Sequence, residues 1–119
     1  MSEKVCVITG GTSGIGKATA EAMRRRGYAV YELSRREAGA EGFYHIPTDV
    51  TKPEMVDDAV AEILRQEDHI DVLINNAGFG VSGAVEFTDT AAAKKQFEVN
   101  FFGMVNMCHA VLPVMRRAG

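Results

Sequence analysis

The feature that most constrains this chain is an alternation of short apolar runs with stretches of helical spacing. Val5–Ile8 is a continuous apolar run that leads into a glycine-rich turn, and Ile15, Ala18 and Ala22 follow at helical spacing up to Gly27. Apolar runs of this length are typical of strands that a parallel sheet buries on both faces. The pattern therefore predicts strand–helix–strand units.

The same alternation continues along the rest of the chain. Strands are expected at residues 29–33, around 44–46 and at 71–75, and helices from the Thr51–Glu54 capping box and from about Asp89 to Arg117. The segment between the second and third strands is too short for a crossover helix, so one turn or none is expected there. Right-handed crossovers then predict an α/β fold, a Rossmann-type doubly wound parallel sheet with strand order 3-2-1-4 and flanking helices.

Composition indicates one globular domain over residues 1–119. With 46% hydrophobic and 24% charged residues, the chain is neither a disordered segment nor a disulfide scaffold. A net charge of -3 argues against a nucleic-acid or anionic-membrane partner. The start of the chain lacks the apolar stretch of a signal peptide, and Cys6 and Cys108 lie in apolar runs, as buried free thiols do. We expect a cytoplasmic protein without a metal site, since the three histidines have no metal-ligand spacing.

The last predicted helix has an unusual composition. Between Val99 and Met115 there is no Asp, Glu, Lys or Arg, and apolar side chains fall on all sides of the helix. Such a helix needs partners on two faces. One face can pack on the sheet, and the other predicts a homo-oligomer, formed through this helix or through the edge of the fourth strand. A membrane span is not expected, because Asn100, Asn106 and Pro113 interrupt a stretch that is also too short.

A glycine-rich turn joins the first strand to the first helix. Its glycines, Gly10, Gly14 and Gly16, follow the spacing G-x-x-x-G-x-G. Glycines let the backbone approach a pyrophosphate, and the amides at a helix start face the anion. On its own this turn could also be a plain tight turn. It is not a P-loop, because no Gly-Lys-Ser/Thr follows.

A second unusual strand end is expected at the same place. In open parallel sheets ligands bind beyond the carboxyl ends of the strands at the point where strand order reverses. With the order 3-2-1-4 these are strands one and four, and strand four ends in Asn75-Asn76-Ala77-Gly78. The two strand ends therefore predict one shared crevice.

Four motifs in order resemble the short-chain dehydrogenase/reductase family, classical type. They are Thr9-Gly10-x-x-x-Gly14-Ile15-Gly16, Asp49-Val50-Thr51, Asn75-Asn76-Ala77-Gly78, and Asn100 in Val99-Asn100-Phe101. Residues 75–80 with the later Leu112-Pro113 are similar to hydroxysteroid-dehydrogenase-like members. The resemblance covers nearly all of this chain but about half of the family's domain, so it implies a truncated Rossmann-type fold.

The resemblance also implies roles for individual residues. The residues of the glycine turn would line the pyrophosphate and the adenosine ribose: Gly10, Thr12, Ser13, Gly14, Ile15 and Gly16. Asp49 and Val50 would flank the adenine. Asn76, Ala77 and Gly78 would lie beneath the nicotinamide-side ribose. Asn100 would hold a water in a proton relay. Without the resemblance, Asn100 would be a polar residue at a helix interface and Asp49 a loop carboxylate.

The end of the second strand bears on the choice of cofactor. An NAD-preferring site places a carboxylate there for the ribose 2′-hydroxyl. Here Ser34 occupies the position, and Arg35 and Arg36 follow it. A guanidinium matches a 2′-phosphate and no acid at that position repels it, so NADP(H) is favoured over NAD(H), with Arg35 the better candidate. The alternative is that the arginines form only a solvated turn.

The family's catalytic serine and Tyr-x-x-x-Lys pair do not occur in these 119 residues. The residues four positions after Tyr28, Tyr31 and Tyr44 are Glu32, Arg35 and Thr48, and no serine follows Ser82. We therefore expect the NADP(H)-binding half of an oxidoreductase that interconverts an alcohol and a ketone, inactive by itself. The alternatives are a non-catalytic nucleotide-binding or dimerisation module and a ligand-sensing regulator.

Overall fold

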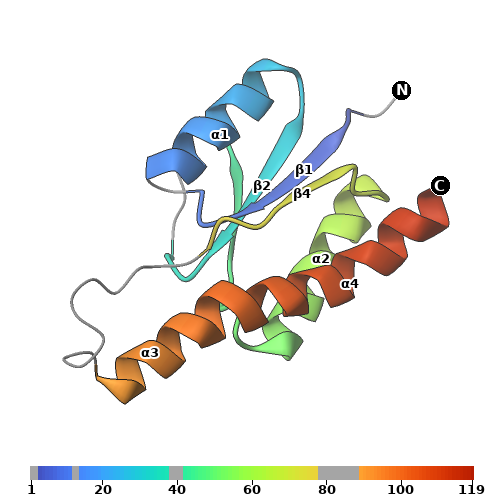
Figure 1. Cartoon of the computed structure of the whole chain (residues 1–119). Coiled ribbons are helices and arrows are strands. Elements are labelled where there is room, and N and C mark those ends of the chain that lie inside the picture. Colours follow the sequence, from blue (N-terminus) through green and yellow to red (C-terminus); the bar gives the residue numbers. More distant parts are fainter. Residues whose placement is uncertain (1–2, 12–13, 38–41, 78–88) are drawn as a thin grey trace.

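A computed structural model describes residues 3–11, 14–37, 42–77 and 89–119 of the chain (Figure 1). Four strands form one parallel sheet with the order β3-β2-β1-β4. They are β1 (Val5–Thr9), β2 (Ala29–Ser34), β3 (Tyr44–Pro47) and β4 (Val72–Ile74). The predicted fold class and strand order are confirmed. The expected turn between β2 and β3 falls partly on residues 38–41, outside the described ranges.

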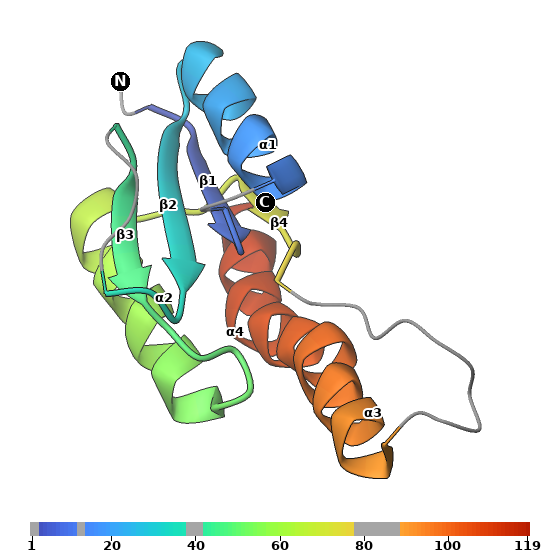
Figure 2. The same ribbon diagram turned by 90° about the vertical axis from the view of Figure 1, so that its left-hand side faces the viewer.

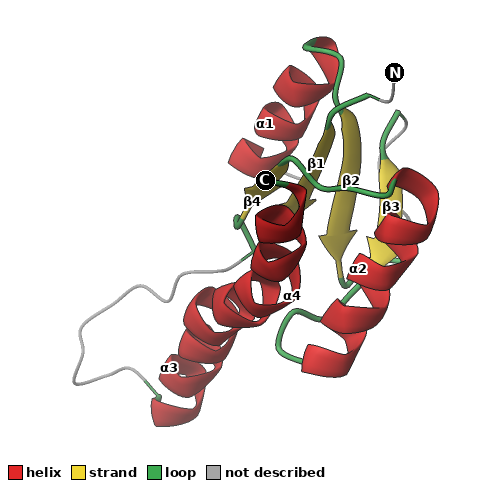
Figure 3. Ribbon diagram, turned by 90° about the vertical axis from the view of Figure 1, so that its right-hand side faces the viewer, coloured by secondary structure: helices red, strands yellow, loops and turns green. Residues whose placement is uncertain are grey.

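Helices cover both faces of this sheet. On one face lies α1 (Gly14–Arg25), and on the other lie α2 (Pro53–Glu67) and α4 (Gly103–Ala118) (Figure 3). The arrowheads of the strands point toward the end of the sheet where α3 (Thr90–Phe97) is found (Figure 2). The carboxyl ends of the strands, where ligands bind in such folds, therefore lie at that end.

The two faces bury different cores. Side chains from β1 and β2 pack with those of α2 and α4 in the larger cluster, which includes Val7, Leu33, Ile63, Met107 and Val111. The α1 face has a smaller cluster, formed by Cys6, Ile8, Ala20 and Val30. Burial raises the pKa of the Cys6 thiol to about 11, so the thiol stays protonated near neutral pH.

The predicted capping box before α2 is wrong. Lys52 is the N-cap residue and makes no side-chain capping bond, while Pro53 is in the first turn. The Thr51 hydroxyl instead donates to Asp49 Oδ1 at 2.7 Å. Thr51 therefore orders the loop before the helix, and the fixed φ of Pro53 favours the helix start.

The single long helix predicted from Asp89 to Arg117 is divided. Asp89 caps α3 by accepting from the Ala91 N–H, and a π-helical turn, η2 (Glu98–Phe102), separates α3 from α4. Apolar side chains do occur on more than one side: Met107 and Val111 are buried, whereas the exposed apolar side chains include Phe97, Phe101, Phe102, Met104 and Leu112. Among the described helices, none has both the length and the apolar content that a membrane crossing requires.

Candidate functional site

A cavity of about 220 Å³ lies at the carboxyl ends of β1 and β2. Its lining is drawn from five separate parts of the chain: Gly10, Leu33, Ser34, Arg35, Thr48, Asp49, Val50, Ala77 and Val99. Residues predicted from three distinct motifs therefore meet in one place. They come together because parallel strands present their carboxyl ends at the same edge of the sheet.

The glycine turn approaches the end of β4 too closely for side chains. Gly10 has φ +69°, and a Cβ there would lie 3.0 Å from Ala77 Cα. A Cβ on Gly16 would overlap the Gly10 carbonyl and the Asn76 amide. Gly14 also has positive φ, +59°. Glycine is therefore required at these positions by conformation or by space.

Of the other residues predicted in or near the turn, Ile15 is described by the structure. Ile15 is at the start of α1 with 80% of its surface exposed, so it is free of the core. Thr12 and Ser13 lie outside the described residues, as does Gly78 after β4. Gly14 begins α1, and a Cβ built on it would have no heavy atom within 4 Å.

Thr9 joins the ends of β1 and β4. Its hydroxyl, in a residue only 1% exposed, accepts from the N–H groups of Asn76 at 3.0 Å and Ala77 at 2.9 Å. The Asn76 side chain donates to the Gly10 carbonyl at 3.0 Å. The side-chain nitrogen of the neighbouring Asn75 lies 3.8 Å from Cys108 Sγ, so the contacts between the two strand ends include Asn76.

Asp49 is held as a carboxylate at the rim of the cavity. It accepts from the Thr51 N–H at 3.0 Å and from the Thr51 hydroxyl. Burial alone would raise the pKa of Asp49, but these bonds and the charges of Arg35 and Lys52 bring that pKa below its ordinary value. The charge of Arg35 thus acts on Asp49 across the cavity, with both side chains also lining an adjoining cavity of about 350 Å³.

Val50 is fixed by the start of α4. Asn106 Nδ2 donates to the Val50 carbonyl at 2.9 Å, and a Cβ on Gly103 would lie 2.5 Å from Val50 Cγ2. The absence of a side chain at Gly103 therefore lets α4 approach the crevice. Asn100 lies in η2, and with Thr9 and Val50 it lines a small cavity of about 40 Å³ next to the main one. π-Helical turns of this kind are frequent at functional sites.

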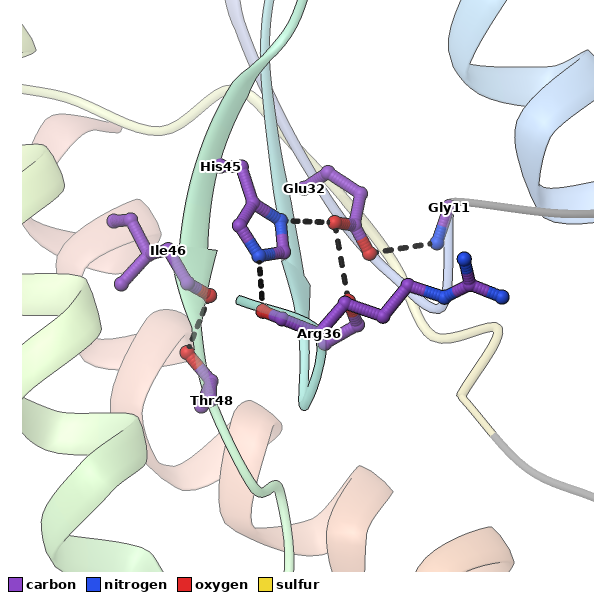
Figure 4. A network of polar contacts seen from close by, with 7 residues as sticks. Gly11, Glu32, Arg36, His45, Ile46 and Thr48 are labelled. Atoms are coloured by element: carbon purple, nitrogen blue, oxygen red, sulfur yellow. Dashed lines mark hydrogen bonds and ion pairs between the residues drawn. The ribbon is translucent and has the colours of Figure 1, made fainter. Parts of the chain in front are cut away.

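Sequence reasoning missed a buried polar network beside the glycine turn (Figure 4). Glu32, 1% exposed, accepts from the Gly11 N–H at 3.0 Å and lies 2.5 Å from His45 Nδ1. His45 Nε2 in turn contacts the Arg36 carbonyl at 2.6 Å. A signal was present in the sequence, because Glu32 is an acid within the apolar run of β2. A buried acid requires a partner.

Two further observations limit where other sites could lie. A cavity of about 400 Å³ opens at the amino ends of β2 and β3, lined by Arg24, Tyr28, Phe43 and Tyr44 among others, and it contains none of the predicted residues. Among the residues that the structure describes, no three His, Cys, Asp or Glu side chains are grouped as metal ligands. Of the predicted residues that the structure describes, Gly10, Ser34, Arg35, Asp49, Val50 and Ala77 line the crevice at the carboxyl ends.

Comparison with known proteins gives the same picture. The sequence model of the short chain dehydrogenase family matches residues 4–119. A 3-ketodihydrosphingosine reductase of Bacteroides thetaiotaomicron is 43% identical over 119 residues, which are 99% of this chain and 44% of that protein. The chain thus spans less than half the length of this curated relative.

Solved structures agree in fold. The ligand-free aldohexose dehydrogenase of Thermoplasma acidophilum superposes with a TM-score of 0.91 at 34% identity, over 98% of this chain and 46% of that one. The structure of ElxO with NADP bound has a TM-score of 0.90 at 28% identity, over 98% of this chain and 52% of that one.

Proposed function

This chain belongs to the short-chain dehydrogenase family, and we propose that residues 1–119 form a single half domain that binds NADP(H) for an oxidoreductase. The observation that carries the proposal is the cavity at the carboxyl ends of β1 and β2, where Gly10, Arg35 and Asp49 meet. Three sequence motifs far apart in the chain would rarely share one crevice as unrelated turns. Dinucleotides bind at this position in open parallel sheets.

The residues present fit such a cofactor. Gly10, Gly14 and Gly16 clear side chains from the backbone that would face the pyrophosphate, and the amides at the start of α1 offer donors to an anion. In the proposal Asp49 and Val50 flank the adenine, while Asn76 and Ala77 lie beneath the nicotinamide-side ribose. Thr12, Ser13, Ile15 and Gly78 are also predicted to contact the cofactor, and their roles stay predictions.

Preference for NADP(H) rests on the end of β2. Ser34 and Arg35 line the cavity, and the exposed Arg35 guanidinium is a planar donor suited to a 2′-phosphate. The charge of Asp49 partly offsets that of Arg35 in the free chain. The NADP-bound state of the similar ElxO supports this preference.

The chemistry is proposed to be the interconversion of an alcohol and a ketone. When bound, NADP(H) donates or accepts the hydride. Asn100, beside the crevice in η2, would hold a water on the proton path. The name of the Bacteroides relative, a reductase of a keto compound, supports a ketone substrate. Because these 119 residues contain no Tyr-x-x-x-Lys, we propose that they bind cofactor without turning over substrate by themselves.

The alternative function is a non-catalytic module. Phe97, Phe101 and Phe102 are exposed and lie together, with ring centroids 5.9 Å and 5.2 Å apart for the successive pairs, and an exposed apolar patch of this kind supports self-association. We propose a homo-oligomer formed through this segment or through the edge of β4, in a cytoplasmic setting. A sedimentation series that shows one concentration-independent monomer would contradict the proposed oligomer.

Calorimetric titration tests the proposed cofactor. At low salt the chain should bind NADPH more tightly than NADH, and Arg35→Ala should reduce this preference by about tenfold, the loss of one charged hydrogen-bonding group. Two further variants are measured beside it. Arg36→Ala shows whether the neighbouring arginine contributes to the preference, and Arg65→Ala on α2 is the control that removes an exposed charge far from the site. Equal affinity for both cofactors would refute the preference, and no binding of either would favour the non-catalytic module.

A further inference from the structure

We propose that Glu32 and His45 form a positioning pair that sets 2′-phosphate recognition without touching the cofactor. The pair joins the glycine turn to the turn that carries Arg35 and Arg36 (Figure 4). The inference deepens the proposed function and rests on it, since those two turns are the proposed sites of the pyrophosphate and of the 2′-phosphate.

Glu32 makes direct contact with the glycine turn. Its Oε2 accepts from the Gly11 N–H at 3.0 Å, and a Cβ on Gly11 would lie 2.8 Å from Glu32 Cγ. The length and hydrogen-bonding of Glu32 therefore determine how far the turn stands from β2.

The second oxygen of Glu32 is also used. Oε1 accepts from the Ser34 hydroxyl at 3.2 Å and lies 2.5 Å from His45 Nδ1. The parallel register of β2 and β3 places Glu32 directly beside His45. The Glu32 side chain is only 2% exposed, and that of His45 only 8%, so water cannot easily replace either partner.

His45 extends the connection to the arginine turn. A carbonyl oxygen only accepts, so His45 Nε2 donates to the Arg36 carbonyl, at 2.6 Å. The imidazole is held at both nitrogens, which fixes its ring and connects it to the backbone at Arg36, in the turn after β2. Gly11 and Arg36, separated by 25 positions in the numbering, are thereby linked through two side chains.

The pair also removes a repulsion between the Glu32 carboxylate and a bound phosphate. A carboxylate next to a proposed phosphate site would repel the phosphate if its charge were uncompensated. A proton must lie between Glu32 Oε1 and His45 Nδ1 for the short contact to be a hydrogen bond, and that proton leaves the pair without net charge. His45 thus allows an acid to support the turn without opposing an anion.

Amide hydrogen exchange in the free chain tests the positioning without any ligand. Glu32→Met keeps the side-chain length and removes the acceptor, so exchange at the Gly11 N–H should be about tenfold faster. Glu32→Gln is the matched control: its amide oxygen accepts from Gly11 and its amide nitrogen donates to His45 Nδ1. It should restore slow exchange. Equal exchange in Glu32→Met and the wild type would overturn the pair's role.

The ratio of NADH to NADPH dissociation constants tests the consequence for selectivity. His45→Phe retains a ring and removes both hydrogen bonds, and we expect the ratio to fall about tenfold, as in Arg35→Ala. The double variant should fall no further than Arg35→Ala, because both changes remove the same recognition. Glu32→Gln keeps the hydrogen bonds of the pair and should retain the wild-type ratio. If His45→Phe loses the ratio while Glu32→Gln keeps it, the loss follows from the missing hydrogen bonds.

The outcomes separate this inference from the proposed function. A wild-type chain that prefers NADPH, with the same ratio in His45→Phe, overturns the positioning pair and leaves the cofactor proposal intact. Additive losses in the double variant also overturn it. A wild-type chain that binds neither cofactor overturns the proposed function and the selectivity role together.

Discussion

The two faces of the sheet differ in what they bury. The face covered by α2 and α4 is an apolar core in which Val7, Ile63 and Met107 are fully enclosed. The face covered by α1 has fewer buried apolar side chains and, at its carboxyl end, the polar pair Glu32 and His45. Stability is therefore expected to come mainly from the first face, while the second gives room to groups that shape the glycine turn.

This difference has a physical basis in how the chain uses its helices. On one face α2 and α4 together cover the larger apolar cluster, whereas on the other α1 covers the smaller one, and the buried Glu32 lies on β2 near its end. Buried polar groups remove little apolar surface from water, so they add little to stability in that way. When all their hydrogen bonds are made, however, they fix the local geometry. Substitutions on the two faces should therefore differ in how much stability they remove.

Ile63→Ala should have the largest effect. Ile63 is fully buried in the α2 and α4 core, and truncation leaves a cavity, with an expected loss of about 2–5 kcal/mol in the free energy of unfolding. Urea denaturation measures it. Ile15→Ala, at a side chain 80% exposed, is the control and should change stability by less than about 0.5 kcal/mol. Similar losses of stability in Ile63→Ala and Ile15→Ala would show that burial in the α2 and α4 core does not determine stability.

Thr9→Val should come next. Valine keeps the shape of threonine but leaves the N–H groups of Asn76 and Ala77 without their acceptor, at about 1–3 kcal/mol. Thr9→Ser retains the hydroxyl and should lose less. Thermal unfolding and exchange of the Ala77 amide measure the two effects. If Thr9→Val unfolds like the wild type, the hydroxyl does not hold β4 against β1.

Val7→Ala and Val30→Ala make the same chemical change on opposite faces. Each removes about two methylene equivalents, roughly 1–2 kcal/mol by transfer alone. Val7 lies in the larger core and should lose more, because two helices restrict collapse around the cavity. Val30 faces the smaller cluster. Equal or reversed losses in denaturant titrations would show that the two faces contribute alike.

A pH effect away from both faces should be smallest. The Glu3 carbonyl, and then the charge of Asp71, raise the pKa of His69 above its ordinary value despite some desolvation. Protonated His69 therefore adds stability below about pH 6.5, and this is lost as pH rises through the folded-state pKa. With partial exposure the gain should stay below about 1 kcal/mol. His69→Gln should remove that part of the pH dependence, and an unchanged profile would refute it.

Local patterns predicted much of this structure. Apolar runs and helical spacing gave the right strands, because burial on both faces demands such runs, and parallel crossovers then limited the strand order. The meeting of Gly10, Arg35 and Asp49 followed from the geometry of parallel strand ends. These inferences needed only short-range periodicity and one rule of topology.

What escaped prediction depends on register and on competition between partners. Glu32 meets His45 only because β2 and β3 pair in one register, which neither strand encodes alone. Thr51 fails to cap α2 because Asp49 accepts its hydroxyl. The π-helical turn at Asn100 interrupts a segment whose composition is uniformly suited to a helix. Each outcome is decided by tertiary contacts that lie outside the local pattern.

Amide chemical shifts during titration with NADPH test whether the cofactor binds at the carboxyl ends of β1 and β2. If the cofactor binds in the crevice, saturable shifts are expected at Gly10, Gly11, Ser34, Arg35 and Ala77, while the amides of Tyr28 and Phe43 at the other end of the sheet stay unchanged. Saturable shifts confined to Tyr28 and Phe43, or no shifts at the crevice under conditions that saturate binding, would contradict it.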